Sequence, residues 1–238
     1  MEISKLDLLH KEPIFLFGIG HLKVPTLNDI RHAGKSYDTY MGMLNIEDLD
    51  LADKIGVPLN GRDRFHYIIQ IPDLRAFYEE LFRFFFLEDL VFQPVGSMWI
   101  LMGEKGCVGT INEENFPDVV NAILICNHLE PKKATPMKFF NEKARRIYEK
   151  IQSGKKAMQV SKHSSGTSIA DLVSAVAANS PSYNLFNIWD LTIYQLYDQF
   201  AQLNQRFGFD ISSMRWAAYS TEKFDLSGWY RPKQKKEE

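Results

Sequence analysis

Several short stretches carry residue types that could do chemistry, but each lacks a partner feature that the chemistry needs. Gly18-Ile-Gly20 follows an apolar run, as the glycines of a dinucleotide-binding loop do. Where that fingerprint needs its third glycine the sequence has Lys23, and Pro25 interrupts the helix that should begin there. We therefore expect a plain turn. The glycine-rich stretch 103–109 lacks the Lys-Ser/Thr pair of a phosphate-binding loop and predicts a hairpin turn.

Candidate metal ligands and nucleophiles are equally incomplete. Asp48, Asp50 and Asp53 resemble the start of a calcium loop, but the glycine that such a loop needs at its sharp turn is missing. Cys126 and His128 lie near the end of one apolar helix, with no third ligand or orienting carboxylate close in the sequence. We expect no metal, no cofactor and no catalytic residue, so the protein is predicted not to be an enzyme.

Composition sets the class of protein. Hydrophobic residues make up 45% of the 238 and charged residues 24%, which is typical of one large or two small globular domains. Two well-separated cysteines form neither a zinc motif nor a disulfide framework, which indicates a reducing, intracellular compartment. The most apolar segment, 81–92, is interrupted by Arg83, Glu88 and Asp89, so no membrane span is expected.

The charge is unevenly distributed, although the net formal charge is only −2. Segment 132–162 holds ten Lys or Arg residues against two acids, Glu142 and Glu149. A solvated helix face running into a linker explains this pattern, and no aromatic residue in the linker offers a platform for base stacking. An arm that binds nucleic acid or an acidic protein is the alternative.

Periodicity predicts an α+β fold that is predominantly helical with a small antiparallel β meander. We expect a strand at 14–17 and a helix from about Thr26, which would cap it. A stronger helix begins at Pro72, and the meander follows over 90–112. Two further helices are expected, one with Asn112 as its cap and one over 136–152.

The chain divides into four predicted regions. Residues 1–152 form an N-terminal α+β domain, and residues 153–166, rich in Ser, Gly and Lys, form a linker. Residues 167–232 form a C-terminal helical module, and 233–238 is a solvated tail. The module contains a helix that Thr167 or Ser168 caps.

The second helix of that module, 187–207, raises the question of function. Asn187 and Asp190 are placed as its N-cap and third-position acid, and a separate shorter helix is expected over 207–220. An apolar stripe spaced 4-3-4-3-4 runs along it: Trp189, Ile193, Leu196, Phe200, Leu203 and Phe207.

Large side chains also lie off this stripe, so the helix must bury a second face against the N-terminal domain or another subunit. Trp and Tyr are frequent interface anchors. The predicted contacts with a partner, or between the two domains, are Trp189, Leu191, Ile193, Tyr194, Leu196, Tyr197 and Phe200.

Three segments together resemble proteins of the tail-morphogenesis clusters of long-tailed bacteriophages and prophages of Gram-positive bacteria. They are KVPTLNDIRHAGKSYDTYMGML, FRFFF with INEENFPDVVNAILICN, and ADLVSAVAANSPSYNLFNIWDLTIYQLYDQFAQLNQRF. The resemblance covers about a third of the chain and carries no catalytic or ligand-binding residues.

The resemblance implies a non-enzymatic tail assembly protein, chiefly a chaperone that binds the tape-measure or tube protein in the host cytoplasm. A structural minor tail or baseplate component of the virion is an alternative, as is a nucleic-acid-binding factor that uses segment 132–162. Self-association into a homo-oligomer is compatible with each of these roles.

Overall fold

The computed structural model describes residues 3–46, 51, 56, 64–129, 168–220 and 224. Five sequence predictions fall outside these residues: the helix over 136–152, the basic segment 132–162, the linker 153–166, the tail 233–238 and the aspartates of the candidate calcium loop. The described part confirms the α+β class, with helices predominating over two small antiparallel sheets.

The N-terminal segment forms a short helix and a hairpin. Helix α1 (Lys5–Leu9) is followed by strands β1 (Ile14–Leu16) and β2 (Gly20–Leu22), which pair antiparallel. Gly18 lies in the intervening turn with a φ of 73°, a conformation that glycine adopts at little cost. The plain-turn prediction is confirmed for Gly18, whereas Gly20 is the first residue of β2, a strand that was not predicted.

Thr26 caps helix α2 (Leu27–Ala33), as its sequence predicts, and Asp29 completes a capping box. Gly34 then adopts a positive φ of 55° and separates α2 from α3 (Lys35–Leu44). The expected single helix is therefore two.

The next helix in the described part of the chain, α5 (Arg64–Gln70), was not predicted. Four of its seven side chains are buried, and a helix of seven residues is too short to show a clear helical period. Helix α6 (Pro72–Phe85) begins at Pro72 as expected, because proline suits the first turn.

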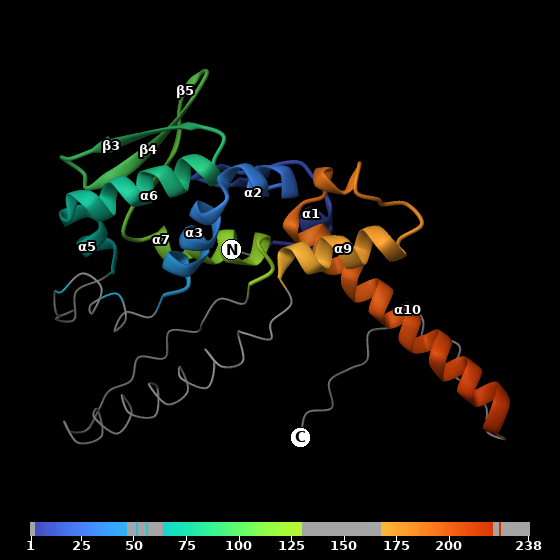
Figure 1. The fold of residues 1–238 in the computed structure, drawn as a ribbon. Helices are drawn as coiled ribbons and strands as arrows, with labels where there is room; N and C mark the ends of the chain where they lie inside the picture. The colour runs from blue at the N-terminus through green and yellow to red at the C-terminus, as the bar shows by residue number, and fades with distance from the viewer. Residues whose placement is uncertain are drawn as a thin grey trace.

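The predicted meander is present as the sheet β3 (Asp89–Gln93), β4 (Met98–Gly103) and β5 (Gly106–Ile111). Alternate residues of the central strand, including Trp99 and Leu101, are fully buried. Figure 1 shows α6 lying along one face of this sheet.

Helix α7 (Phe116–Cys126) follows the sheet, and its N-cap is Asn115 rather than the predicted Asn112. The Asn112 side chain instead accepts hydrogen bonds from the backbone N–H groups of Glu114 and Asn115, which shapes the loop before the helix.

In the C-terminal part, Ser168 caps α9 (Ile169–Asn179), in agreement with the sequence. The expected start of the next helix is wrong. Residues Ile188–Asp190 form a 3₁₀ turn, η1, and α10 (Ile193–Tyr219) begins only after Thr192, which accepts a hydrogen bond from the Gln195 backbone. The separate shorter helix is also wrong, because α10 runs unbroken for 27 residues.

One buried cluster contains apolar residues of the N-terminal elements together with Leu172, Val176, Ile193 and Leu196 of α9 and α10. The second half of α10 extends away from this body (Figure 1). Even this longest of the described helices lacks the apolar stretch that a bilayer span needs.

Candidate partner-binding surfaces

The predicted contact residues lie at the start of α10 and in the turn before it, where they pack within the chain itself. Leu191, Ile193 and Leu196 are buried in the common core. The other four are partly buried against it: Trp189, Tyr194, Tyr197 and Phe200. The N-terminal elements and α9 therefore supply much of the burial that this region needs.

Main-chain hydrogen bonds join this region to the N-terminal part. The Leu27 N–H donates to the Leu191 carbonyl at 2.8 Å, and the Ile193 N–H donates to the Pro25 carbonyl at 3.2 Å. These two bonds form an isolated antiparallel bridge between Thr26 and Thr192. The start of α10 is consequently fixed by backbone as well as by side chains.

Polar side chains add to this attachment. The Lys5 ammonium lies 2.8 Å from the Asp198 carboxylate, and this hydrogen bond raises the pKa of Lys5. The Gln195 side-chain amide donates to the Leu9 carbonyl at 2.8 Å. Helix α1 is thus bound to the first turns of α10.

His128 meets α10 after the end of α7. Its ring stacks on Tyr197 with 4.7 Å between centroids and 9° between planes. Burial raises the pKa of the Tyr197 phenol, and burial likewise raises the pKa of the Cys126 thiol to about 12. Cys126 is fully buried and His128 packs on Tyr197, so both residues contribute to packing.

Another candidate for chemistry is an open pocket of about 380 Å³ between α5, the β3–β4 turn and the loop before α7. Its titratable lining residues are His66, Glu113 and Glu114. Across the described ranges, no group of three or more His, Cys, Asp or Glu side chains lies close enough to hold a metal ion.

The first exposed apolar surface is on the part of α10 that extends from the body. Phe207, Ile211 and Met214, here called the outer stripe, share one helix face, and Ile211 and Met214 are 63% and 64% exposed. Phe207 is the last residue of the predicted stripe. The same three- and four-residue spacing continues to Ile211 and Met214, so the sequence pattern could have predicted that the stripe extends to these two residues.

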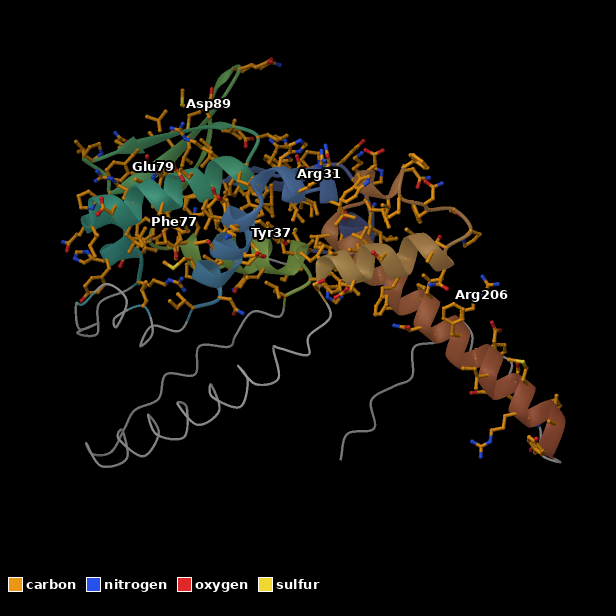
Figure 2. The ribbon with its side chains drawn as sticks, in the orientation of Figure 1. Arg31, Tyr37, Phe77, Glu79, Asp89 and Arg206 are labelled. Atoms are coloured by element: carbon orange, nitrogen blue, oxygen red, sulfur yellow. The ribbon has the colours of Figure 1, made fainter. Side chains whose placement is uncertain are left out.

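The second exposed apolar surface is the side of the β3–β4–β5 sheet that faces away from the core. We call it the outer sheet face and define it by Val91 of β3, Ile100 and Met102 of β4, and Leu87 just before β3. Val91 pairs directly with Ile100 across the strands, and Val91 is 52% exposed. Asp89, labelled in Figure 2, lies on the same side.

A buried carboxylate joins the β1–β2 hairpin to the residue just before β3. Glu88 accepts a hydrogen bond from the His21 backbone N–H at 2.9 Å, and its side chain lies 2.6 Å from the His21 ring nitrogen Nδ1. The His21 ring in turn contacts Phe15 with 4.9 Å between centroids. No local pattern in the sequence points to this long-range arrangement.

Comparison with known proteins links the C-terminal part to phages. Residues 158–232 match the family model described as the YomV second domain, which is a phage-derived family named after a Bacillus prophage protein. This range contains α9 and α10 but covers less than half of the chain. No curated protein and no solved structure matches the chain. The C-terminal part is therefore similar to a phage-associated type of domain.

Proposed function

We propose that this protein is a non-enzymatic bacteriophage tail assembly protein that acts through protein–protein contacts. The match to a phage-derived domain supports a phage-related protein, and the resemblance to tail-morphogenesis proteins supports a role in tail assembly. The site of action would be the host cytoplasm, where tails are built.

The observation that carries the proposal is the outer sheet face. Exposed apolar patches of this kind, rimmed by polar residues, are typical of binding surfaces. Here Val91 and Met102 are exposed on a sheet whose other side contains buried Trp99 and Leu101, and Leu87 is exposed just before β3. A rigid apolar surface of this kind suits recognition of a folded or extended segment of another protein.

We assign the tape-measure or tube protein as the partner of the outer sheet face. Co-expression of the full chain with each tail protein, followed by affinity purification, tests this assignment. We expect one of the two to co-purify in a fixed ratio. If neither tail protein co-purifies, the chaperone role is wrong.

A matched pair of substitutions tests the surface separately from the role. Val91→Glu places a charge on the outer sheet face and should weaken recovery of the tail protein. Val95→Glu introduces the same charge in the β3–β4 turn, where Val95 is 96% exposed, and should leave recovery unchanged. If both variants bind normally, the tail protein binds elsewhere.

Mass spectrometry of purified virions distinguishes the two tail roles. A chaperone should be absent from the finished particle, whereas a minor tail or baseplate component should be present.

A further inference from the structure

The apolar stripe of α10 runs from the protein core into solvent. An α-helix turns 100° per residue, which places Leu196, Phe200, Leu203 and the outer stripe on one face. Leu196 is fully buried, Phe200 and Leu203 are partly buried, and Phe207, Ile211 and Met214 are exposed. The outer stripe therefore continues a packing surface that the chain itself uses at its other end.

The opposite side of the same helix has a partner within the chain. Phe209 and Trp216 contact the Phe224 ring, with centroid distances of 5.3 Å and 5.5 Å. Both residues lie roughly half a turn from the outer stripe. The described part of the chain thus covers the far side of α10 and leaves the outer stripe open.

Charges along this part of the helix define what can cover the stripe. Between residues 200 and 219 the only charged side chains are Arg206, Asp210 and Arg215. Such depletion of charge is a mark of interface cores. Arg206 and Asp210 are four residues apart and border the same edge of the stripe. Arg206 lies on the part of α10 that extends beyond the body (Figure 2).

A covering helix must therefore place an acid level with Arg206 and a base level with Asp210. No ion pair among the described residues uses either side chain. A second copy of α10 running antiparallel meets both requirements, because a twofold axis brings the same edge of each stripe together. With the axis level with residue 208, Arg206 of one helix faces Asp210 of the other, twice.

We propose that the outer stripe pairs with the outer stripe of a second copy in an antiparallel homodimer centred on Gly208. In this register Phe207 packs beside the axis, and Leu203 lies within one residue of the level of Met214 of the partner subunit. Gly208 borders the other edge of the stripe, and the space next to it is open. A glycine destabilises the middle of a helix. We attribute its presence here to the room that it leaves for a closely packed second helix.

This inference does not rest on the proposed function, because it concerns only this chain, and it leaves the outer sheet face of each copy free. The purified full chain, without any tail protein, tests it. Sedimentation equilibrium should give twice the mass of 27.6 kDa. A monomer at every accessible concentration overturns the proposal.

Charge reversal tests the register. Arg206→Glu alone sets two acids against each other at both symmetric positions, and Asp210→Arg alone sets two bases against each other. Each variant should raise the dimer dissociation constant on the order of tenfold. An equimolar mixture of the two should form a heterodimer as tight as the unaltered homodimer, because every acid at these positions then faces an arginine of the other chain.

The mixture also separates the contact between chains from a contact within one helix. Neither single variant can restore an Arg–acid pair at positions 206 and 210 of its own chain, so restored affinity requires pairing across the interface. If the mixture dimerises no better than the single variants, the antiparallel register is wrong. Circular dichroism of each variant verifies that α10 is folded.

Thiol crosslinking locates the axis in a Cys107→Ser background. Gly208→Cys should be joined efficiently to its own copy by a short bifunctional maleimide. Ser212→Cys is an exposed control one turn along, where the two cysteines would be separated by about 12 Å along the helix axes. Equal crosslinking at both positions contradicts an axis at residue 208.

Discussion

Thr26 and Thr192, far apart in the chain, are the N-caps of two different helices and lie side by side, bridged through their backbones. Each side chain accepts a hydrogen bond from the third residue of its helix, Asp29 or Gln195. The two helix starts are therefore fixed to each other as well as capped.

Removal of one of these caps should destabilise the fold. Thr192 is fully buried, and Thr192→Ala deletes the acceptor of the Gln195 N–H. We expect the free energy of unfolding in urea to fall by about 1–2 kcal/mol. Thr39→Ala, in the exposed part of α3, is the control and should change it by less than about 0.5 kcal/mol. Equal losses of unfolding free energy in the two variants would mean that the Thr192 cap does not stabilise the fold more than an exposed threonine does.

The Asp29 carboxylate gives the fold a dependence on pH. Burial acts to raise its pKa, but hydrogen bonds from the Thr26 backbone and hydroxyl and from the Lys23 ammonium outweigh burial and lower the pKa below 3.8. A lowered folded-state pKa means that the ionised carboxylate stabilises the fold above pH 3.8. That stabilisation is lost as the pH falls through the folded-state value.

Asp29→Asn should therefore be less stable than the unaltered protein at neutral pH, and the difference should shrink in acid. Urea unfolding at a series of pH values measures it. Lys23→Met removes one of the donors and should give a smaller pH-dependent difference in the same direction. A difference between Asp29→Asn and the unaltered protein that stays constant with pH would contradict this account.

Local sequence signals predicted much of the fold. Caps at Thr26 and Ser168, Pro72 at a helix start and glycines in the hairpin turns act within a few residues of the chain, so the pattern alone reveals them. Helix α5 was not predicted from the sequence, because it is short, most of its residues are buried, and its sequence shows no clear amphipathic period.

The start of α10 could not be predicted locally. Asn187 with Asp190 and Thr192 with Gln195 both satisfy the rules for a cap and its third residue. In the structure the N-cap is Thr192, which forms the bridge to Thr26. A contact between residues so far apart in the chain cannot be detected from a local sequence pattern. For the same reason, the sequence could not show that Leu191, Ile193 and Leu196 are buried within the chain.

A buried hydrogen bond joins α3 to the end of α7. The Tyr37 hydroxyl donates to Asn127 Oδ1 at 2.9 Å, and burial raises the pKa of this phenol. Tyr37→Phe leaves that oxygen without its donor, which should cost about 1–3 kcal/mol of unfolding free energy. Tyr219→Phe, at a side chain that is 88% exposed, is the control. Equal effects of the two changes would refute the importance of this bond.

Replacing each of two glycines by alanine should change the stability of the fold in opposite directions. A Cβ on Gly109 would fall on the carbonyl oxygens of Gly18 and Ile19, because the hairpin packs directly against β5. We expect Gly109→Ala to lower stability by about 1–3 kcal/mol. Gly42 lies in α3 with open space around it, so Gly42→Ala should raise stability by about 0.5–1 kcal/mol. Thermal unfolding of both variants checks the pair.

The two thiols should differ sharply in reactivity. Cys107 is exposed, whereas Cys126 is fully buried with its pKa raised to about 12. An alkylating reagent should modify only Cys107 in the native protein and both cysteines after denaturation, as intact-mass spectrometry can show. Native Cys107→Ser should remain unmodified. Rapid labelling of Cys126 in that variant would show that α7 opens readily.

The hydrogen bond from Gln195 to the Leu9 carbonyl spans 186 positions of the chain. A ribosome releases the chain from its N-terminus at roughly 5–20 residues per second, so α1 emerges on the order of 10–40 s before the helix on which it docks. During that interval Leu8, which is buried in the finished fold, has no α10 to pack against. Because α10 is synthesised late, α1 can complete its packing only after the first turns of α10 have formed.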